Sequence, residues 1–327
     1  MKVLITGASG FLGSHVAEQL SLAGHQVRAL VRKSSNRKFL ESLPNVELAY
    51  GAVEEADKVD AAVEGVDAIV HAAGIVKARS SEEFQKINLG GTVNVIAAAK
   101  KRAKSIRRLV YISSLEACGP SETDTPVRVD QENPVTAYGR SKLAAEKAIL
   151  AIKDEIPVVT LRPTGIYGPR DIEIFEVFKA VQRRVLPITG DGSSKVTFTY
   201  ATDCAKAVIR AILADIPSGR TYFITDGKVY VQREAMEEVE RAIGKRALVR
   251  KGLPLGIISA VAFGVETYGK VANKAVMLTR EKANMLGMPY WVCTTDDAIA
   301  ELGWKPEIDW VQGTRLTVKW YRENGWL

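Results

Sequence analysis

The chain has 327 residues and a formal net charge of +7, from 45 lysines and arginines against 38 aspartates and glutamates. Hydrophobic residues make up 46% of it, which excludes a disordered chain and allows one large domain or two ordinary ones. The modest positive charge favours an anionic ligand such as a phosphorylated cofactor, and it gives no reason to expect a nucleic-acid partner. Three scattered cysteines and three histidines that do not cluster argue against a disulfide framework or a metal site, so we expect no metal and a reducing cytoplasm.

The first half of the chain alternates short apolar runs with helical patterns. The predicted strands are residues 3–6, 26–31, 46–49, 68–71, 109–113 and 158–162. The predicted helices between them are residues 11–23, 36–42, 58–64, 81–102 and 137–153. Continuous apolar strands alternating with helices are typical of a parallel sheet covered on both faces. The sequence therefore predicts an α/β fold with a Rossmann-type, doubly wound parallel sheet over residues 1–165.

Helical patterns dominate after Pro163. They cover residues 172–183, 203–214, 232–243, 279–286, 295–302 and 310–323, and the strands become short and isolated, at 197–200 and 221–224. We expect residues 166–327 to form a smaller, mostly helical substrate domain that interleaves with the first and closes over it.

An apolar stretch lies within this second domain, at residues 253–265. It is 13 residues long, whereas a membrane-spanning helix needs about 20 apolar residues, so we do not expect integral membrane association. A buried or lid helix is the simpler interpretation, and peripheral membrane contact is the alternative. Residues 2–7 are typical of a buried strand and not of a targeting segment, which agrees with a cytoplasmic protein.

A glycine-rich turn follows the first predicted strand. Gly7, Gly10 and Gly13 have the spacing G-x-x-G-x-x-G and lead directly into a helix. Gly7 would allow the tight turn, Gly10 would let the backbone approach a pyrophosphate, and Gly13 would let helix and strand lie close. The helix start would then offer free N–H groups to the phosphates. The sequence predicts a dinucleotide site here; its residues in this turn are Gly7, Ser9, Gly10, Phe11, Leu12 and Gly13.

The end of the second predicted strand bears on the choice between NADP and NAD. In NAD-binding proteins an acidic residue at this place accepts hydrogen bonds from the ribose hydroxyls. Here Val31 occupies the place, and Arg32 and Lys33 follow. An arginine can stack on adenine and pair with a 2′-phosphate. NADP is therefore favoured, with NAD left open.

Tyr138 and Lys142 form a Tyr-x-x-x-Lys pair within the predicted helix 137–153. The i, i+4 spacing places both side chains on one face, where the ammonium would lower the pKa of the phenol. Tyr138 could then exchange a proton with a substrate hydroxyl. Ser113 and Ser114 end the fifth strand, and ligands of open α/β sheets bind beyond the carboxyl ends of the strands.

The chain resembles the extended short-chain dehydrogenase/reductase family, of the NAD-dependent epimerase/dehydratase type. The resemblance is close in the first half and loose in the second. The motifs that carry it are Thr6-Gly7-x-x-Gly10-x-x-Gly13, His71-Ala72-Ala73-Gly74, Asn88, Ser113-Ser114, Tyr138-x-x-x-Lys142 and Leu161-Arg162-Pro163-x-x-x-Tyr167-Gly168-Pro169.

The resemblance implies a role for several residues. Ser114, five residues before Gly119, would hold the substrate oxygen, Tyr138 would be the acid and base, and Lys142 would hold the nicotinamide ribose. Further cofactor contacts would come from Ala72, Ala73 and Pro163, and Asn88 would steady the site. The resemblance also implies a homodimer formed through the helices 81–102 and 137–153.

Departures from the family pattern bear on the substrate. Leu115-Glu116 replaces the Asp-Glu pair of the sugar-nucleotide dehydratases, and Cys118 replaces the tyrosine usual in the epimerases. Val196 stands where the epimerases carry an arginine for the diphosphate, although the neighbouring Lys195 could substitute. The apolar residues of the second domain that could instead contact a substrate are 253–265, Met277, Met285, Met288, Tyr290 and Trp291.

These departures place the chain nearest the branch that resembles 3β-hydroxysteroid dehydrogenases and dihydroflavonol reductases. The expected function is an NAD(P)-dependent oxidoreductase that interconverts an alcohol and a ketone on a bulky hydrophobic small molecule. A nucleotide-sugar epimerase with tightly bound NAD is the main alternative, and a non-catalytic NAD(P)-binding regulator is a minor one.

Overall fold

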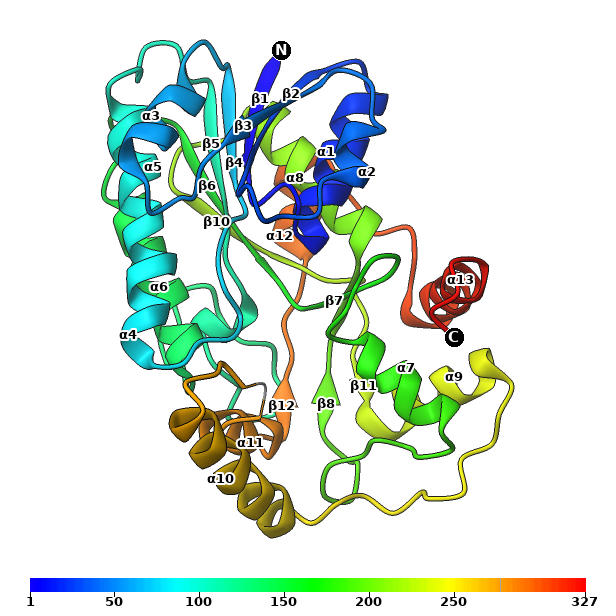
Figure 1. Ribbon diagram of the computed structural model, residues 1–327. Coiled ribbons are helices and arrows are strands. Elements are labelled where there is room, and N and C mark those ends of the chain that lie inside the picture. The colour runs from blue at the N-terminus through cyan, green and yellow to red at the C-terminus, as the bar shows by residue number, and fades with distance from the viewer. Residues whose placement is uncertain (277) are drawn as a thin grey trace.

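A computed structural model describes residues 1–276 and 278–327; Met277, part of the apolar set predicted above, lies outside the described residues. At the centre is a seven-stranded sheet in which all neighbouring strands are parallel (Figure 1). From one edge to the other it runs β10 (Arg220–Ile224), β6 (Val158–Pro163), β5 (Arg108–Ile112), β4 (Ala68–His71), β1 (Lys2–Thr6), β2 (Gln26–Val31) and β3 (Val46–Tyr50). Because the strand order reverses between β1 and β4, the sheet is doubly wound, as predicted.

Helices cover both faces of the sheet. Val3 and Ile5 of β1 belong to the core on one face, whereas Leu4 belongs to the core on the other. Successive strand residues point to opposite faces, so both kinds of position must be apolar. The first face is covered by α1 (Phe11–Leu22), the short α2 (Lys38–Glu41), α8 (Ala201–Leu213) and α12 (Asp296–Leu302). The second face is covered by α3 (Ala56–Val63), α5 (Gly90–Lys100) and α6 (Ala137–Leu150).

The predicted helix 81–102 is interrupted. It consists of α4 (Ser81–Phe84), a π-helical turn (Gln85–Leu89) and α5. The wider turn contains Asn88, whose side chain is buried and bonded to Ile75 and Ser141. Single π-turns within helices occur frequently at functional sites.

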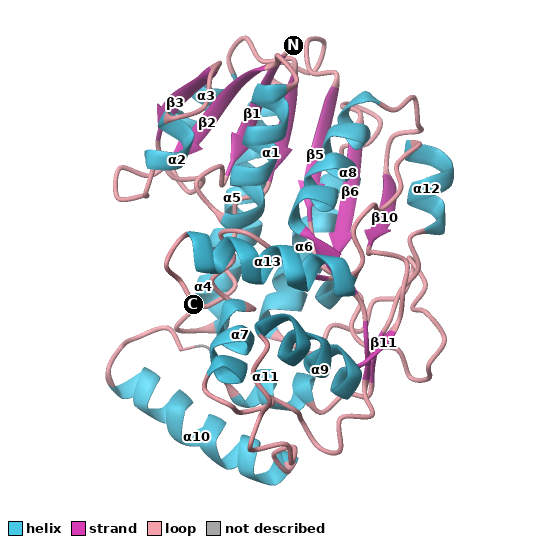
Figure 2. Cartoon of the chain, turned by 90° about the vertical axis from the view of Figure 1, so that its right-hand side faces the viewer, coloured by secondary structure: helices cyan, strands magenta, loops and turns pink. Residues whose placement is uncertain are grey.

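Most of the remaining elements form a smaller body beyond the carboxyl ends of the strands (Figure 2). Four of its largest buried side chains are aromatic: Tyr167, Phe178, Trp310 and Tyr321. Its elements are β7 (Gly165–Tyr167), α7 (Phe175–Gln182), β8 (Lys195–Val196), β9 (Phe198–Tyr200), β11 (Tyr230–Val231), α9 (Gln232–Ile243), α10 (Leu255–Val271), α11 (Arg280–Leu286), β12 (Tyr290–Trp291) and α13 (Trp310–Glu323).

The expectation of an isolated strand at 221–224 is wrong. The strand β10 pairs with β6 along its whole length and becomes the seventh strand of the main sheet. Tyr222 and Ile224 are buried there, beneath α8 and α12, and Phe223 is buried in a separate cluster with Leu115 and Cys118. Residues well beyond 165 therefore complete the sheet, and the two predicted domains interleave.

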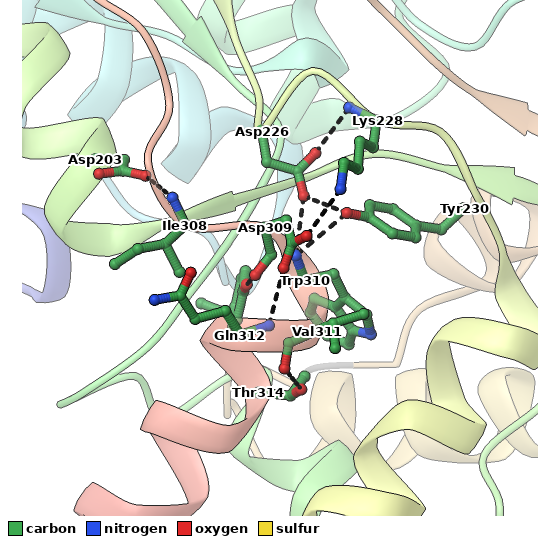
Figure 3. Close-up of polar contacts among 11 residues, drawn as sticks. Asp203, Asp226, Lys228, Tyr230, Ile308, Asp309, Trp310, Val311, Gln312 and Thr314 are labelled. Carbon is green, nitrogen blue, oxygen red and sulfur yellow. Dashed lines mark hydrogen bonds and ion pairs between the residues drawn. The ribbon is translucent and has the colours of Figure 1, made fainter.

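Buried carboxylates join the sheet to α13 (Figure 3). Asp226, directly after β10, accepts hydrogen bonds from the Tyr230 hydroxyl at 2.7 Å and from the Trp310 backbone N–H at 3.1 Å. Asp203 of α8 accepts from the backbone N–H groups of Glu307 and Ile308, both at 2.8 Å. Burial raises the pKa of Asp203 and of Asp226, while these bonds oppose the rise.

The apolar stretch 253–265 contributes to α10, but the helix is not buried. Only Ile258, Ala262 and Gly269 of α10 are buried, and Ile258 and Ala262 pack against Ala283 of α11. The interpretation as a buried helix is therefore wrong. Within the described parts of the chain, no helix has the length and apolar character needed to cross a membrane.

Candidate active site

The turn between β1 and α1 has room for glycine alone at two positions. Gly7 has a φ of +73°, and a Cβ there would lie 2.7 Å from the backbone nitrogen of Ala73. A Cβ on Gly13 would lie 2.1 Å from the carbonyl oxygen of Gly7. The Gly7 carbonyl also accepts a hydrogen bond from the Gly10 N–H at 2.9 Å. The glycine spacing thus allows the turn, the end of β4 and the start of α1 to approach closely.

A cavity of about 350 Å³ opens beside this turn. Of the predicted cofactor residues, those that line it are Gly7, Ser9, Gly10, Arg32, Ala72 and Ala73. Phe11, Leu12, Gly13, Lys33 and Pro163 are not among its lining residues. Leu12 belongs instead to the core, Gly13 supports the turn, and Lys33 points to solvent.

The cavity fits the phosphates of a dinucleotide. The residue before α1 is Gly10, which supplies no side-chain cap, so the first-turn N–H groups of α1 are free of side-chain partners. Arg32 adds a positive charge at the end of β2. When bound here, a nicotinamide cofactor would supply a hydride donor or acceptor.

Lys142 lies within α6 and points to the end of β5. Its ammonium donates a hydrogen bond to the carbonyl of Ile112 at 2.5 Å and lies 4.4 Å from the centroid of the Tyr111 ring. Burial lowers its pKa to about 7, against the opposing charge of Glu146. A Cβ on Gly74, which lines the cofactor cavity, would be 3.9 Å from the Lys142 Nζ, so Lys142 adjoins that cavity.

Tyr138 stands one turn earlier on α6 and is half-buried. Burial raises its pKa, the charge of Glu116 raises it further, and a hydrogen bond with the Ser114 side chain opposes the rise. The expected lowering of the phenol pKa by Lys142 is therefore wrong for this structure. The reason is that burial of the phenol, and after it the charge of Glu116, determine the direction, while the Lys142 ammonium is bonded to the Ile112 carbonyl.

The two serines after β5 have different surroundings. Ser114 is half-buried, its Oγ accepts from the Glu116 backbone N–H at 3.1 Å, and its hydroxyl lies close enough to Tyr138 to act on the pKa of that phenol. Ser113 is buried, and its Oγ has no hydrogen-bond partner within residues 1–276 and 278–327. The structure thus brings Ser114, and not Ser113, together with Tyr138.

Asn88 fixes α6 to the loop after β4. Its amide nitrogen donates to the Ser141 Oγ at 2.9 Å, and its amide oxygen accepts from the Ile75 backbone N–H at 2.8 Å. The Ser141 hydroxyl in turn donates to the Tyr138 carbonyl at 2.7 Å. Asn88 therefore positions α6, which carries Tyr138 and Lys142.

Glu116 connects the site to the second domain. Its carboxylate accepts from the Thr136 hydroxyl at 2.8 Å and from the Lys282 ammonium at 3.1 Å. The neighbouring Glu281 accepts from the Ala137 backbone N–H at 2.6 Å, at the start of α6. The sequence gives no local signal for these contacts of α11, because more than 140 residues separate the partners.

A buried ion pair, formed by Arg162 and Glu146, lies near Lys142. The guanidinium of Arg162 pairs with the carboxylate of Glu146 at 2.6 Å, and it donates to the Cys118 sulfur at 2.8 Å. Among the residues that the structure describes, no three His, Cys, Asp or Glu side chains form a group that could hold a metal ion.

A doubly wound parallel sheet, a glycine turn at the end of its first strand and a cavity beside that turn define a dinucleotide-dependent enzyme of the short-chain dehydrogenase/reductase type. The sequence model of the NAD dependent epimerase/dehydratase family matches residues 3–225, and the chain belongs to that family.

Three relatives illustrate the range of the family. The chain is 31% identical over 333 residues to the ceramide reductase of Caulobacter vibrioides, with 99% of this chain and 96% of the relative aligned. It is 32% identical over 335 residues to the 2-alkyl-3-oxoalkanoate reductase of Stenotrophomonas maltophilia, with 96% and 98% aligned. It is 29% identical over 266 residues to a 3 beta-hydroxysteroid dehydrogenase/Delta 5-->4-isomerase of Mycobacterium tuberculosis, with 75% and 70% aligned.

Solved structures of lower identity share the fold. The dTDP-glucose 4,6-dehydratase of Bacillus anthracis in complex with NAD superposes with a TM-score of 0.78 at 22% identity, over 99% of this chain and 97% of that one. The UDP-glucose 4-epimerase of Thermotoga maritima superposes with a TM-score of 0.80 at 19% identity, over 99% of both chains. At these identities the likeness concerns the fold alone.

Proposed function

We propose that the protein is an NAD(P)-dependent oxidoreductase that interconverts a ketone and an alcohol on a bulky hydrophobic molecule. The observation that carries the proposal is the grouping of Ser114, Tyr138 and Lys142 at the carboxyl end of β5, where Lys142 adjoins the cofactor cavity and burial raises the pKa of Tyr138. A phenol that keeps its proton at neutral pH is a hydrogen-bond donor and a general acid, which is what reduction of a carbonyl requires.

In reduction, Ser114 Oγ and Tyr138 OH would donate hydrogen bonds to the substrate carbonyl oxygen. These donors would stabilise the negative charge that the oxygen gains when a bound nicotinamide cofactor supplies a hydride to the carbon, and the Tyr138 OH would transfer its proton to that oxygen. The product is the alcohol. Lys142, with a pKa of about 7, lies next to the cofactor cavity and can hold the ribose while exchanging a proton.

An apolar substrate is favoured because residues 195 and 196, at the place where a sugar diphosphate would need a cation, offer no unpaired one. Val196 offers no charge there, and the ammonium of Lys195 is paired with Asp124 at 2.9 Å. Two phosphate charges without a partner would be costly to desolvate. Two of the relatives above are named as reductases of ceramide and of 2-alkyl-3-oxoalkanoates, which agrees with a lipid-like carbonyl compound.

A screen of cofactor-dependent absorbance tests this function. Purified protein with NADPH or NADH would be offered long-chain 3-oxo compounds, keto-sphingoid and steroid ketones, and nucleotide sugars. We expect oxidation of the reduced cofactor with an apolar ketone and no binding of UDP in calorimetry. Tight UDP binding together with a cofactor that co-purifies and does not exchange would favour the epimerase alternative.

We further propose that the cofactor is NADP, because Arg32 lines the cavity at the end of β2 and no acidic residue ends that strand. Replacing Arg32 by Asp should weaken NADPH binding about 10–150-fold, the value of one charge-assisted bond, and leave NADH binding intact. Lys33→Asp makes the same charge change at an exposed residue outside the cavity lining and serves as the control. Equal losses for both cofactors in Arg32→Asp would remove Arg32 from 2′-phosphate recognition.

The assembly that we propose is a homodimer formed through the outer faces of α5 and α6. These helices lie side by side, and they expose Val93 and Leu150, each 48% accessible. Sedimentation velocity of the wild type and of Val93→Lys would test it, with a monomeric variant expected.

A further inference from the structure

The helix α10 presents an apolar surface to solvent. Ile257, Val261, Tyr268 and Val271 are 52%, 51%, 61% and 84% exposed, and their spacing of four, seven and three residues places them on one side of the helix. Phe263, 57% exposed, borders this surface, whereas Leu255 lies on the side of the buried Ile258 and reaches Gly287 at the end of α11. Exposed apolar patches of this kind mark interaction sites. We call Ile257, Val261, Phe263, Tyr268 and Val271 the α10 surface.

The α10 surface stands clear of the rest of the molecule. In Figures 1 and 2 the helix runs along an outer edge, far from the sheet, with α11 beside it. The two helices share a small core of Ile258, Ala262 and Ala283, which occupies the opposite side of α10. The exposed side chains are thus not needed to hold the helix in place.

The chain segment that leads into α10 carries only positive charges. Between Glu240 and Glu266 the chain has no acidic residue and five basic ones: Arg241, Lys245, Arg246, Arg250 and Lys251. Lys251 precedes the helix and Lys274 follows it, and both are exposed.

These basic side chains divide into paired and unpaired ones. Arg250 pairs with Glu240, and Arg280 with Glu266. By contrast, Lys251 and Lys274 take part in no ion pair within the described residues, and neither do Lys245 and Arg246. Unpaired cations therefore stand at both ends of an exposed apolar helix.

We propose that the α10 surface, with Lys251 and Lys274, docks the enzyme on an anionic lipid bilayer. A helix with a wide apolar side and basic flanks lies in the plane of the interface, with its apolar side chains at the boundary of headgroups and acyl chains. At 1.5 Å per residue, the 17 residues of α10 reach about 25 Å, short of the length and apolarity of a spanning helix.

The charges favour a lipid surface over a second copy of the chain. A two-fold contact through the α10 surface would bring the same patch of each copy together, and with it the same unpaired lysines. Like charges would then face one another across a low-dielectric contact. Anionic headgroups instead provide the opposite charge that the flanking lysines lack.

Docking in this way would bring the active site near the bilayer. The helix α11 packs on α10 and contacts the start of the catalytic helix, through Glu281 to the Ala137 N–H and through Lys282 to Glu116. A single helix thus separates the lipid-facing surface from Tyr138. An apolar substrate could then pass between membrane and site, a step that rests on the proposed function, whereas docking itself does not.

Vesicle co-sedimentation of the full chain tests docking, without substrate or cofactor. We expect binding to phosphatidylcholine vesicles that contain phosphatidylglycerol, weaker binding to pure phosphatidylcholine, and release by salt, because headgroup attraction is screened. Lys251→Gln and Lys274→Gln should each weaken binding about 5-fold. The double variant Ile257→Ser, Val261→Ser should weaken it about 10-fold or more, because two apolar side chains no longer enter the interface.

Leu22→Ser removes an equally exposed apolar residue at the end of α1 and should leave vesicle binding unchanged. Retained circular dichroism and thermal unfolding would show that the double variant is folded. Equal binding to both vesicle types, or binding that survives Ile257→Ser, Val261→Ser, would overturn the proposal. A wild-type oligomer that this variant dissociates in vesicle-free buffer would assign the α10 surface to a second copy instead.

Discussion

Tyr138 is the residue on which the proposed chemistry depends. Replacing it by Phe removes the proton donor and keeps the ring, so α6 and the cofactor cavity should persist. We expect kcat with a validated ketone to fall about 10²–10⁴-fold, the usual contribution of general acid catalysis. NADPH binding, measured by fluorescence titration, should not change. Tyr268→Phe on the exposed side of α10 is the control, and near-full activity in Tyr138→Phe would exclude Tyr138 as the acid.

The charge of Glu116 sets a pH dependence whose direction can be derived. A negative charge beside a phenol disfavours phenolate, so Glu116 raises the pKa of Tyr138. Glu116→Gln should lower that pKa, and Lys282→Gln should raise it, because it removes the cation that compensates Glu116 at 3.1 Å. Oxidation of the alcohol needs the phenolate as base.

The limb over which kcat/KM for oxidation rises with pH should therefore move to lower pH in Glu116→Gln and to higher pH in Lys282→Gln. Glu122→Gln removes an exposed carboxylate that is not part of this site, and it controls for the change in net charge. Shifts of the same sign in the first two variants would mean that they act through structure and not through charge.

At the residue scale, the sequence predicts what depends on neighbours along the chain. The spacing of Gly7, Gly10 and Gly13 predicts a turn because the positive φ of Gly7 and the close approach of Gly13 to the Gly7 carbonyl lie within seven residues, whereas the contact of Gly7 with Ala73 is seen only in the fold. The pKa of Tyr138 could not be predicted in this way. Its shift comes from burial and from Glu116, and the direction of the Lys142 side chain is set by the Ile112 carbonyl 30 residues away.

At the scale of elements, hydrophobic periodicity predicts bounds well where an element buries its own apolar side. The predicted ranges 26–31, 68–71, 232–243 and 310–323 coincide with β2, β4, α9 and α13. Hydrophobic periodicity fails to predict an element whose conformation or pairing depends on a residue far away in the sequence. The π-turn at Asn88 depends on Ser141, and β10 joins the sheet only through β6, so neither is visible in its own sequence.

The junction between β10 and α13 has a stability that can be measured. Asp226→Ala would leave the Tyr230 hydroxyl without its acceptor, and the Trp310 N–H would keep only the Tyr230 oxygen at 3.2 Å (Figure 3). An unsatisfied buried donor costs about 1–3 kcal/mol, so the free energy of unfolding in urea should fall by at least that amount. Lys228→Ala breaks an exposed ion pair with Asp309 in the same region and should cost less than about 1 kcal/mol. Equal losses in the two variants would contradict this account.

Hydrogen bonds between segments that are distant in sequence hold the whole molecule together, and two buried histidines form some of them. His71 lies between the hydroxyls of Thr6, at 2.7 Å, and Thr92, at 2.9 Å. His15 bonds through Nε2 to the carbonyl of Pro169 at 2.8 Å, and so links α1 to the segment before α7. Burial lowers the pKa of each to about 3, and the charges of Lys142 for His71 and Arg170 for His15 act in the same direction.

This lowering makes the stability dependent on pH. Below the ordinary histidine pKa of about 6.5 the unfolded chain binds protons that the folded chain does not. The contribution of each histidine is therefore present above about pH 6.5 and is lost as the pH falls toward 3, by up to about 1.4 kcal/mol per pH unit. Asp171, whose pKa burial raises to about 7, acts in the opposite sense, so the total slope does not isolate the histidines.

A comparison of the wild type with a His15 variant isolates the pH-dependent contribution of His15 to the free energy of unfolding. His15→Gln keeps an N–H donor for the Pro169 carbonyl and removes the titrating ring, while Asp171 and the other carboxylates stay the same. Urea unfolding at several pH values between 7 and 4 should show wild type and variant converging as the pH falls. The difference in unfolding free energy should change by about 1 kcal/mol per pH unit, since the variant no longer loses stability through this group. A difference that stays constant with pH would show that His15 titrates alike in the folded and the unfolded chain.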